Sequence, residues 1–103
     1  MMYIWYHRHM KVFEWNHEKN KKLQQDRTVT FEMVLIAIEA GYILEVLIHP
    51  NQKKYPNQQI IIVEIENYAY CVPATIEKDK NFLKTIYPSR KDTKEFLDKN
   101  EDE

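Results

Sequence analysis

The chain has 103 residues, of which 44% are hydrophobic and 13% aromatic, and its formal net charge at pH 7 is −1. These values predict one globular domain with a single modest core, and they argue against a disordered chain and against a strongly basic nucleic-acid-binding protein. The single glycine leaves no room for a glycine-rich phosphate loop, and no apolar run reaches the roughly 20 residues that a membrane-spanning helix needs.

The charge is unevenly distributed along this predicted single domain, residues 1–103. Residues 98–103 form an acidic tail, and the 97 residues before it carry 14 basic and 12 acidic side chains. A mildly basic body permits a local RNA-binding surface but does not require one. Cys71 is the only cysteine, so no internal disulfide can form, which favours a cytoplasmic protein with a buried structural thiol.

The N-terminal segment, residues 1–9, is rich in aromatic side chains and precedes a second plausible start at Met10. We therefore treat it as a possible extension of the domain. His7 and His9 alternate as strand neighbours do, but no cysteine or carboxylate stands nearby at a metal-ligand spacing. The sequence therefore predicts neither a metal site nor another cofactor.

A short strand at residues 11–15 is followed by a polar helix. Asn16 is its expected N-cap, and the helix runs from His17 to about Arg27 with Leu23 as its one aliphatic anchor. The helix is locally basic, so it either follows a phosphate backbone or is simply solvated.

A second, apolar helix is expected to begin after Thr30, its predicted N-cap. Its core-facing side chains recur at the spacing of one helix face, and they are Phe31, Val34, Leu35 and Ile38. Gly41 stands where a left-handed C-cap belongs. With the polar helix just before it, this segment predicts a helical hairpin.

The segment from residue 42 to residue 87 has the alternation typical of strands. Its short connections predict an antiparallel meander with strands at Tyr42–Ile48, Gln59–Glu66, Tyr68–Thr75 and Phe82–Tyr87. Pro73 indicates an edge or bulge position within the third of these. With the closing helix described next, the order is β-α-α-β-β-β-β-α, an α+β domain whose helices cover one face of the sheet.

Ser89 is the expected N-cap of that closing helix, with Asp92 placed as in a capping box. Arg90 and Lys91 occupy the first two helical positions, where the macrodipole disfavours cations by roughly 0.3–1 kcal/mol each. Two cations beside free backbone N–H groups would suit a phosphate, and the alternative is a solvated helix start.

Two groups of residues share their spacing with a known protein family. The first group is Phe13, Trp15, Asn16, Lys19, Asn20, Val29, Thr30, Phe31 and Glu32. It resembles the BrnT family of bacterial toxins, in which a strand ending in Phe-x-Trp-Asp precedes a Lys-Asn helix and the next helix begins with Val-Ser-Phe-Glu. The C-terminal IYPSRKDTKEF is similar to the family's closing signature, Ile-Ser-Ala-Arg-x-Ala-Thr-x-x-Glu, with Arg90 and Thr93 on its most recognisable positions.

The resemblance implies a RelE-like fold and a type II toxin, a metal-independent endoribonuclease that cleaves RNA and inhibits translation. Its partners would be an RNA substrate and a cognate antitoxin, with either a toxin–antitoxin hetero-oligomer or a homo-oligomer and no membrane. Two family features are missing, because Asp26-Arg27-Thr28 replaces Lys-His-Gly and residues 57–59 replace Glu-x-Arg. The alternatives are a non-catalytic RNA- or protein-binding domain on the same fold and an oligomerisation module that uses residues 1–9.

Metal-free RNA cleavage needs a base for the 2′-hydroxyl, a cation for the phosphorane charge and an acid for the leaving oxygen. Lys84 interrupts the apolar last strand, so it either snorkels from an exposed face or binds an anion. His49 either acts as acid or base or caps its loop. The candidate catalytic residues are Arg90, Lys84 and His49, and the candidate RNA-binding residues are Lys53, Lys54, Tyr55, Ser89 and Lys91.

Overall fold

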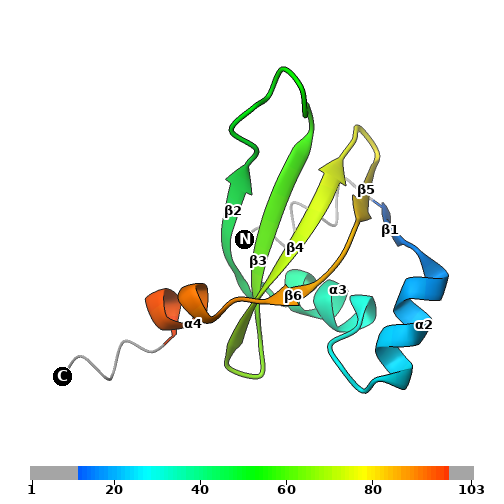
Figure 1. Ribbon diagram of the computed structural model, residues 1–103, viewed down its shortest axis with the longest axis vertical. Helices are drawn as coiled ribbons and strands as arrows, with labels where there is room; N and C mark the ends of the chain where they lie inside the picture. The colour runs from blue at the N-terminus through cyan, green and yellow to red at the C-terminus, as the bar shows by residue number, and fades with distance from the viewer. Residues whose placement is uncertain (1–11, 98–103) are drawn as a thin grey trace.

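Six strands and three helices make up the described part of the chain, residues 12–97 of the computed structural model (Figure 1). In chain order they are β1 (Val12–Trp15), α2 (His17–Gln25), α3 (Phe31–Glu39), β2 (Ile43–Ile48), β3 (Gln58–Ile65), β4 (Tyr68–Ile76), β5 (Lys80–Leu83), β6 (Tyr87–Pro88) and α4 (Arg90–Phe96). The predicted α+β class is confirmed, and the predicted order holds with one additional short strand, β6. The predictions for residues 1–9 and for residues 98–103 lie outside the described residues.

The strand order in the sheet is β1-β5-β4-β3-β2, and β6 is also paired with β4. Strands β2 to β5 form the antiparallel meander that the sequence predicted. The prediction of a wholly antiparallel sheet is wrong at one edge, because β1 pairs with β5 in parallel. Parallel neighbours need a long crossover connection, which the chain from α2 to β4 supplies.

The prediction of one continuous last strand, Phe82–Tyr87, is also wrong. The strand β5 ends at Leu83 and β6 begins at Tyr87. The interruption lies opposite Pro73, where the Lys84 N–H donates to the Pro73 carbonyl at 2.8 Å. Proline has no N–H to donate in return, so the pairing of β4 changes there from β5 to β6. The proline therefore disturbs an interior strand.

The main core lies between the sheet and α3. Three of the four side chains of the predicted apolar stripe of α3 are buried, and two of these, Phe31 and Val34, are completely shielded from solvent. The fourth, Leu35, is only partly buried. The Phe31 ring stacks on Trp15 of β1 with 5.6 Å between ring centroids. These side chains pack on one face of β3, β4 and β5, through Val63, Val72 and Leu83 among others.

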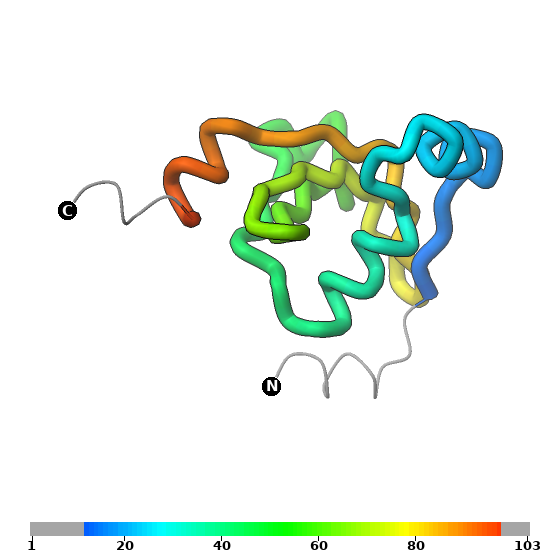
Figure 2. Tube along the Cα trace, turned by 90° about the horizontal axis from the view of Figure 1, so that it is seen from below, coloured from blue at the N-terminus to red at the C-terminus, as the bar shows by residue number. Residues whose placement is uncertain are grey.

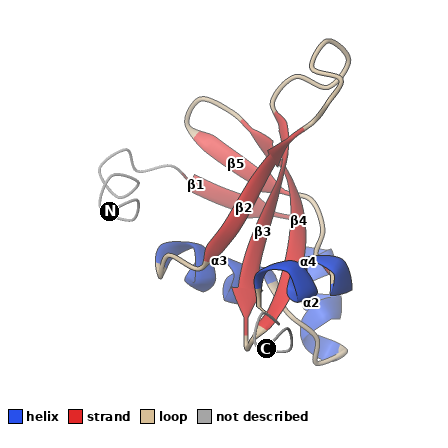
Figure 3. Cartoon of the chain, turned by 90° about the vertical axis from the view of Figure 1, so that its left-hand side faces the viewer, coloured by secondary structure: helices blue, strands red, loops and turns tan. Residues whose placement is uncertain are grey.

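A smaller cluster on the opposite face contains Ile62, Ala69 and Cys71. Cys71 is buried, as predicted, and burial is the largest cause that raises the pKa of its thiol. Its sulfur lies 3.5 Å from Asp92 Oδ2 in α4. Figures 2 and 3 show α3 and α4 on opposite sides of the sheet, so the helices do not all cover one face as predicted.

The predicted helix caps are confirmed by backbone geometry and hydrogen bonds. Asn16, Thr30 and Ser89 each accept a hydrogen bond from the backbone N–H three residues later. Gly41 follows α3 with a φ of 89°, in the left-handed region expected for a glycine at that position. The polar helix α2 ends at Gln25, two residues earlier than expected.

Among residues 12–97, no helix has both the length and the apolar character that crossing a bilayer requires.

The turn between β3 and β4 consists of two residues, Glu66 and Asn67, whose φ values are 53° and 66°. The flanking residues Ile65 and Tyr68 are paired, so this is a tight hairpin with both central residues left-handed. Asparagine adopts this conformation at little cost, whereas glutamate is strained in it. The sequence identified Asn67 as a turn residue.

Replacing Glu66 by Asn is expected to raise the free energy of unfolding by about 0.5–1 kcal/mol, because it relieves this backbone strain. Urea denaturation followed by circular dichroism measures the change. Glu77→Asn makes the same chemical change at an exposed position outside the left-handed region and is the matched control. Equal effects of the two substitutions would contradict the strain argument.

Candidate functional site

Asn20 joins the two helices of the hairpin. Its side chain is buried, with 4% exposed. The amide nitrogen donates to both carboxylate oxygens of Glu32 at 2.9 Å, and the amide oxygen accepts from the Phe31 N–H at 2.9 Å. That N–H belongs to the first residue of α3 and has no partner within its helix. We call this group of three bonds the hairpin clasp.

Several residues that carry the family resemblance build the helical hairpin or join it to the core. Asn16 and Thr30 cap the two helices, Trp15 and Phe31 stack in the core, and Asn20 bonds Glu32. Each of these side chains therefore has a structural task in the described part of the chain. Lys19 is different, because its side chain reaches a distant segment.

Lys19 connects the hairpin to the segment that follows β5. Its Nζ donates to the Lys84 carbonyl at 3.1 Å. In a regular antiparallel ladder this carbonyl would accept from the residue opposite, but that residue is Pro73, which has no N–H. The Lys19 ammonium therefore donates to the Lys84 carbonyl oxygen in place of the N–H that Pro73 lacks. The position of Lys84 therefore depends on α2 as well as on β4.

The side chain of Lys84 lies on the sheet face opposite α3. Its Nζ donates to the side-chain oxygen of Gln58, at the start of β3, at 3.1 Å. Gln58 is paired with Thr75 of β4, which in turn is paired with Phe82 of β5. Within residues 12–97 no carboxylate lies within 4 Å of the Lys84 ammonium. Two of its three N–H donors are available to an anion.

His49 lies beside the same glutamine. Its backbone N–H donates to the Gln58 carbonyl at 3.1 Å, and its Nδ1 accepts from the backbone N–H of Asn51 at 3.0 Å. The predicted loop-capping role of His49 is therefore present. The bond at Nδ1 leaves Nε2 as the ring nitrogen that is available to a ligand.

The loop between β2 and β3 carries the next three candidates. The ring of Tyr55 lies 4.4 Å from that of His49, and Lys54 Nζ lies 5.4 Å from the Tyr55 ring centroid. Lys53 is exposed in the same loop. These side chains form an aromatic and basic rim next to His49.

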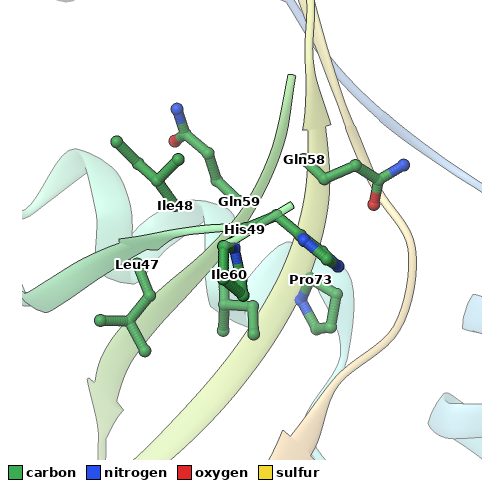
Figure 4. A pocket seen from close by; sticks show the side chains of 8 residues that line it. Leu47, Ile48, His49, Gln58, Gln59, Ile60 and Pro73 are labelled. Carbon is green, nitrogen blue, oxygen red and sulfur yellow. The ribbon is translucent and has the colours of Figure 1, made fainter. Parts of the chain in front are cut away.

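A pocket of about 430 Å³ opens at this place (Figure 4). Its apolar lining includes Leu47, Ile60 and Pro73, and its polar lining includes His49 and Gln58. Ile48 and Gln59, which are paired across β2 and β3, also line the pocket. The arrangement provides an apolar slot with polar groups at its edge.

The start of α4 lies elsewhere along β4. Ser89 N–H donates to the Ala69 carbonyl, four residues from the Pro73 carbonyl that holds Lys84. Four strand residues span roughly 13 Å. Arg90 and Lys91 are exposed there, and the Ser89 hydroxyl is engaged with Asp92. The structure thus brings Lys84 and His49 together at Gln58 but does not bring Arg90 to them.

Two residues of this site were not identified from the sequence. Gln58 is a polar residue at the beginning of a strand, and its position opposite Lys84 depends on the sheet register. The contact of Lys19 with Lys84 joins residues 65 positions apart. Among residues 12–97, no three histidine, cysteine or acidic side chains lie close enough to hold a metal ion.

Comparisons with protein-family models, curated proteins and solved structures find no match to this chain.

The clasp predicts a pH dependence of stability. The hydrogen bond from Asn20 lowers the pKa of the Glu32 carboxyl below its ordinary value of 4.5. Because the folded state favours the carboxylate, this contribution is complete above the unfolded pKa and is lost as pH falls through the folded pKa. The difference in unfolding free energy between the wild type and Glu32→Gln should therefore shrink below about pH 4.5.

Urea denaturation at a series of pH values between 7 and 2.5 measures this difference. Glu39→Gln, at the opposite end of α3, is the matched control for the loss of one carboxylate. A gap between the wild type and Glu32→Gln that is constant over the whole range would contradict the role assigned to the clasp.

Proposed function

We propose that this chain is a BrnT-like toxin of a type II toxin–antitoxin system. It would cleave RNA as a metal-independent endoribonuclease, inhibit translation and be neutralised by a cognate antitoxin. The observation that carries the proposal is the group formed by Lys84, Gln58 and His49 on the open sheet face. The RelE-like form of the α+β fold belongs to the same proposal.

The chemistry follows from the donors in this group. The 2′-hydroxyl oxygen attacks the adjacent phosphorus, the bond to the 5′-oxygen breaks, and a 2′,3′-cyclic phosphate is left. The Lys84 ammonium neutralises the charge that develops on the phosphoryl oxygens. His49 Nε2–H donates a hydrogen bond to the leaving 5′-oxygen, which takes a proton from solvent, while the proton of the 2′-hydroxyl passes to solvent. One cation and one hydrogen-bond donor suit a slow ribonuclease.

The surroundings provide contacts for an RNA strand. Tyr55 offers an aromatic face for base stacking beside His49, and Lys53 and Lys54 supply positive charge in the same loop. Arg90 and Lys91, roughly 13 Å along β4, would hold a phosphate two or three nucleotides away. Ser89 supports this second contact by capping α4.

The proposed antitoxin has a suitable surface at β2. This strand is the edge of the sheet beyond β3, and its Val46, Leu47 and Ile48 side chains are between 42% and 63% exposed. An exposed apolar edge strand accepts a further strand from a partner. Because Leu47 and Ile48 also line the pocket, a partner strand there would cover the site. The same edge would serve a homo-oligomer.

A non-catalytic RNA- or protein-binding domain on this fold is the second candidate. The observation in its favour is the hydrogen bond that His49 Nδ1 accepts from Asn51, because a ring held in this way does not offer a free basic nitrogen. The family's histidine is replaced as well, and Arg27 lies at that place in an exposed left-handed turn.

Lys84→Ala is expected to reduce the cleavage of a labelled mixed-sequence RNA by about 10²-fold, as the loss of one transition-state donor does in other enzymes. Growth arrest on induction should be lost with it, and co-expression of a cognate antitoxin should restore the growth of cells that carry the wild-type chain. Circular dichroism checks that the variant is folded.

Lys78→Ala removes an exposed lysine from the turn before β5 and is the matched control, with cleavage expected to stay near that of the wild type. Arg90→Ala should weaken RNA binding but leave the cleavage rate of bound RNA unchanged. RNA binding without any cleavage by the wild type would overturn the proposal in favour of the second candidate.

A further inference from the structure

The strand β2 leaves one side of the sheet open. Among residues 12–97 it pairs only with β3, and Figure 1 shows it at the margin of the sheet. Edge strands are usually protected by lysine, proline or a bulge. The sequence of β2, ILEVLI, has one charged residue, Glu45, and its register shift lies between Ile43 and Glu45. The residues from Val46 to Ile48 therefore form a regular apolar edge.

One hydrogen bond shows which backbone groups of β2 face outward. The His49 N–H donates to the Gln58 carbonyl, so these two residues form a pair that exchanges hydrogen bonds. Along an antiparallel ladder such pairs alternate with pairs that exchange none. Val46 and Ile48, three residues and one residue before His49, belong to the second kind. Their N–H and C=O groups therefore point away from β3, toward the open edge.

The side chains of this edge are apolar on both faces of the sheet. Val46 is paired with Ile61 of the core under α3, so Val46 and Ile48 lie on that face. Leu47 lies on the other face, and all three side chains are exposed. A strand added to β2 would cover apolar side chains on both faces and satisfy the outward backbone groups.

We propose that the added strand is β2 of a second copy of this chain, related to the first by a two-fold axis at Leu47. In such an antiparallel pair the outward-facing residues must meet each other. Val46 then exchanges hydrogen bonds with Ile48 of the second copy, and the two copies of Leu47 face each other. The net charge of −1 opposes this association only weakly. The homodimer does not depend on the proposed function.

Charge and proline decide the position of the axis. With the axis at Leu47, Glu45 of each copy lies opposite His49 of the other, so a carboxylate faces an imidazole. With the axis one residue earlier, the Glu45 carboxylate would face the apolar side chain of Leu47. With the axis one residue later, Val46 would face Pro50, which has no N–H to donate.

The second copy would contribute a residue to the candidate site. Leu47 and Ile48 line the pocket together with His49, so pairing at β2 brings Glu45 of the second copy to the rim of the pocket. The antitoxin strand proposed above would need the same outward backbone groups. The antitoxin strand and the second copy therefore exclude each other at this edge.

Sedimentation equilibrium of the whole chain tests the homodimer and should give a mass that rises with concentration toward twice that of one chain. Leu47→Lys and Leu47→Glu should each be monomeric, because like charges then face each other across the axis. An equimolar mixture of the two variants should associate more strongly than either alone. Circular dichroism checks that each variant is folded.

Ile36→Lys is the matched control, since it places the same charge on another exposed apolar residue, outside β2, and should remain dimeric. A wild-type chain that stays monomeric at every concentration would overturn the proposal and leave β2 to a different occupant, such as the antitoxin strand. A mixture of the Leu47 variants that associates no better than its components would overturn it as well.

Disulfide formation tests the position of the axis. Leu47→Cys places two thiols directly opposite each other, with Cα atoms about 4.5 Å apart, within the range of a disulfide. Oxidised glutathione should therefore convert this variant into a covalent dimer. Val46→Cys places the two thiols diagonally, about 7–8 Å apart, and should form little disulfide.

The wild-type chain is the control for the native thiol, because Cys71 is buried and should not join two copies. Cross-linking of Val46→Cys that equals or exceeds that of Leu47→Cys would overturn the proposed axis. Loss of RNA cleavage has no bearing on either measurement, so the homodimer and the ribonuclease proposal can fail separately.

Discussion

The missing N–H of Pro73 is the constraint on which the candidate site depends. In an interior strand every backbone group needs a partner, and the proline cannot return the hydrogen bond that Lys84 donates to its carbonyl. The chain leaves the ladder at this point, β5 ends, and the Lys84 carbonyl turns to the ammonium of Lys19. At this interruption of the ladder, the Lys84 side chain reaches Gln58 at the start of β3.

The helical hairpin provides the other half of this arrangement. Lys19 reaches Lys84 only if α2 is held in place, and α2 is short, polar and anchored by few apolar side chains. The hairpin clasp compensates, since the buried Asn20 satisfies the first N–H of α3 and two carboxylate oxygens at once. The residues that carry the family resemblance are therefore mainly those that build and position the hairpin, and the resemblance bears more directly on the fold than on the chemistry.

Sequence reasoning succeeded where a local rule decides the outcome. The caps at Asn16, Thr30 and Ser89 depend on residues three positions apart, and the buried side chains of α3 follow helical spacing. It failed where the outcome depends on pairing across the sheet. A four-residue strand such as β1 carries no signal for the strand that it will join in parallel. The role of Gln58 likewise follows from register, which sequence spacing alone does not give.

At the start of α4, the structure weakens the inference of a bound phosphate that was drawn from the sequence. Arg90 and Lys91 are unfavourable at a helix N-terminus, and this favoured an external phosphate as their partner. The structure places the Asp92 carboxylate in that first turn, where Ser89 Oγ donates to it at 2.6 Å while accepting from its backbone N–H. The negative charge that the helix dipole requires is thus supplied from within, and the two cations need no ligand to be tolerated. Lys84 has no such internal anion among residues 12–97, so the case for a phosphate is stronger at the open sheet face than at the last helix.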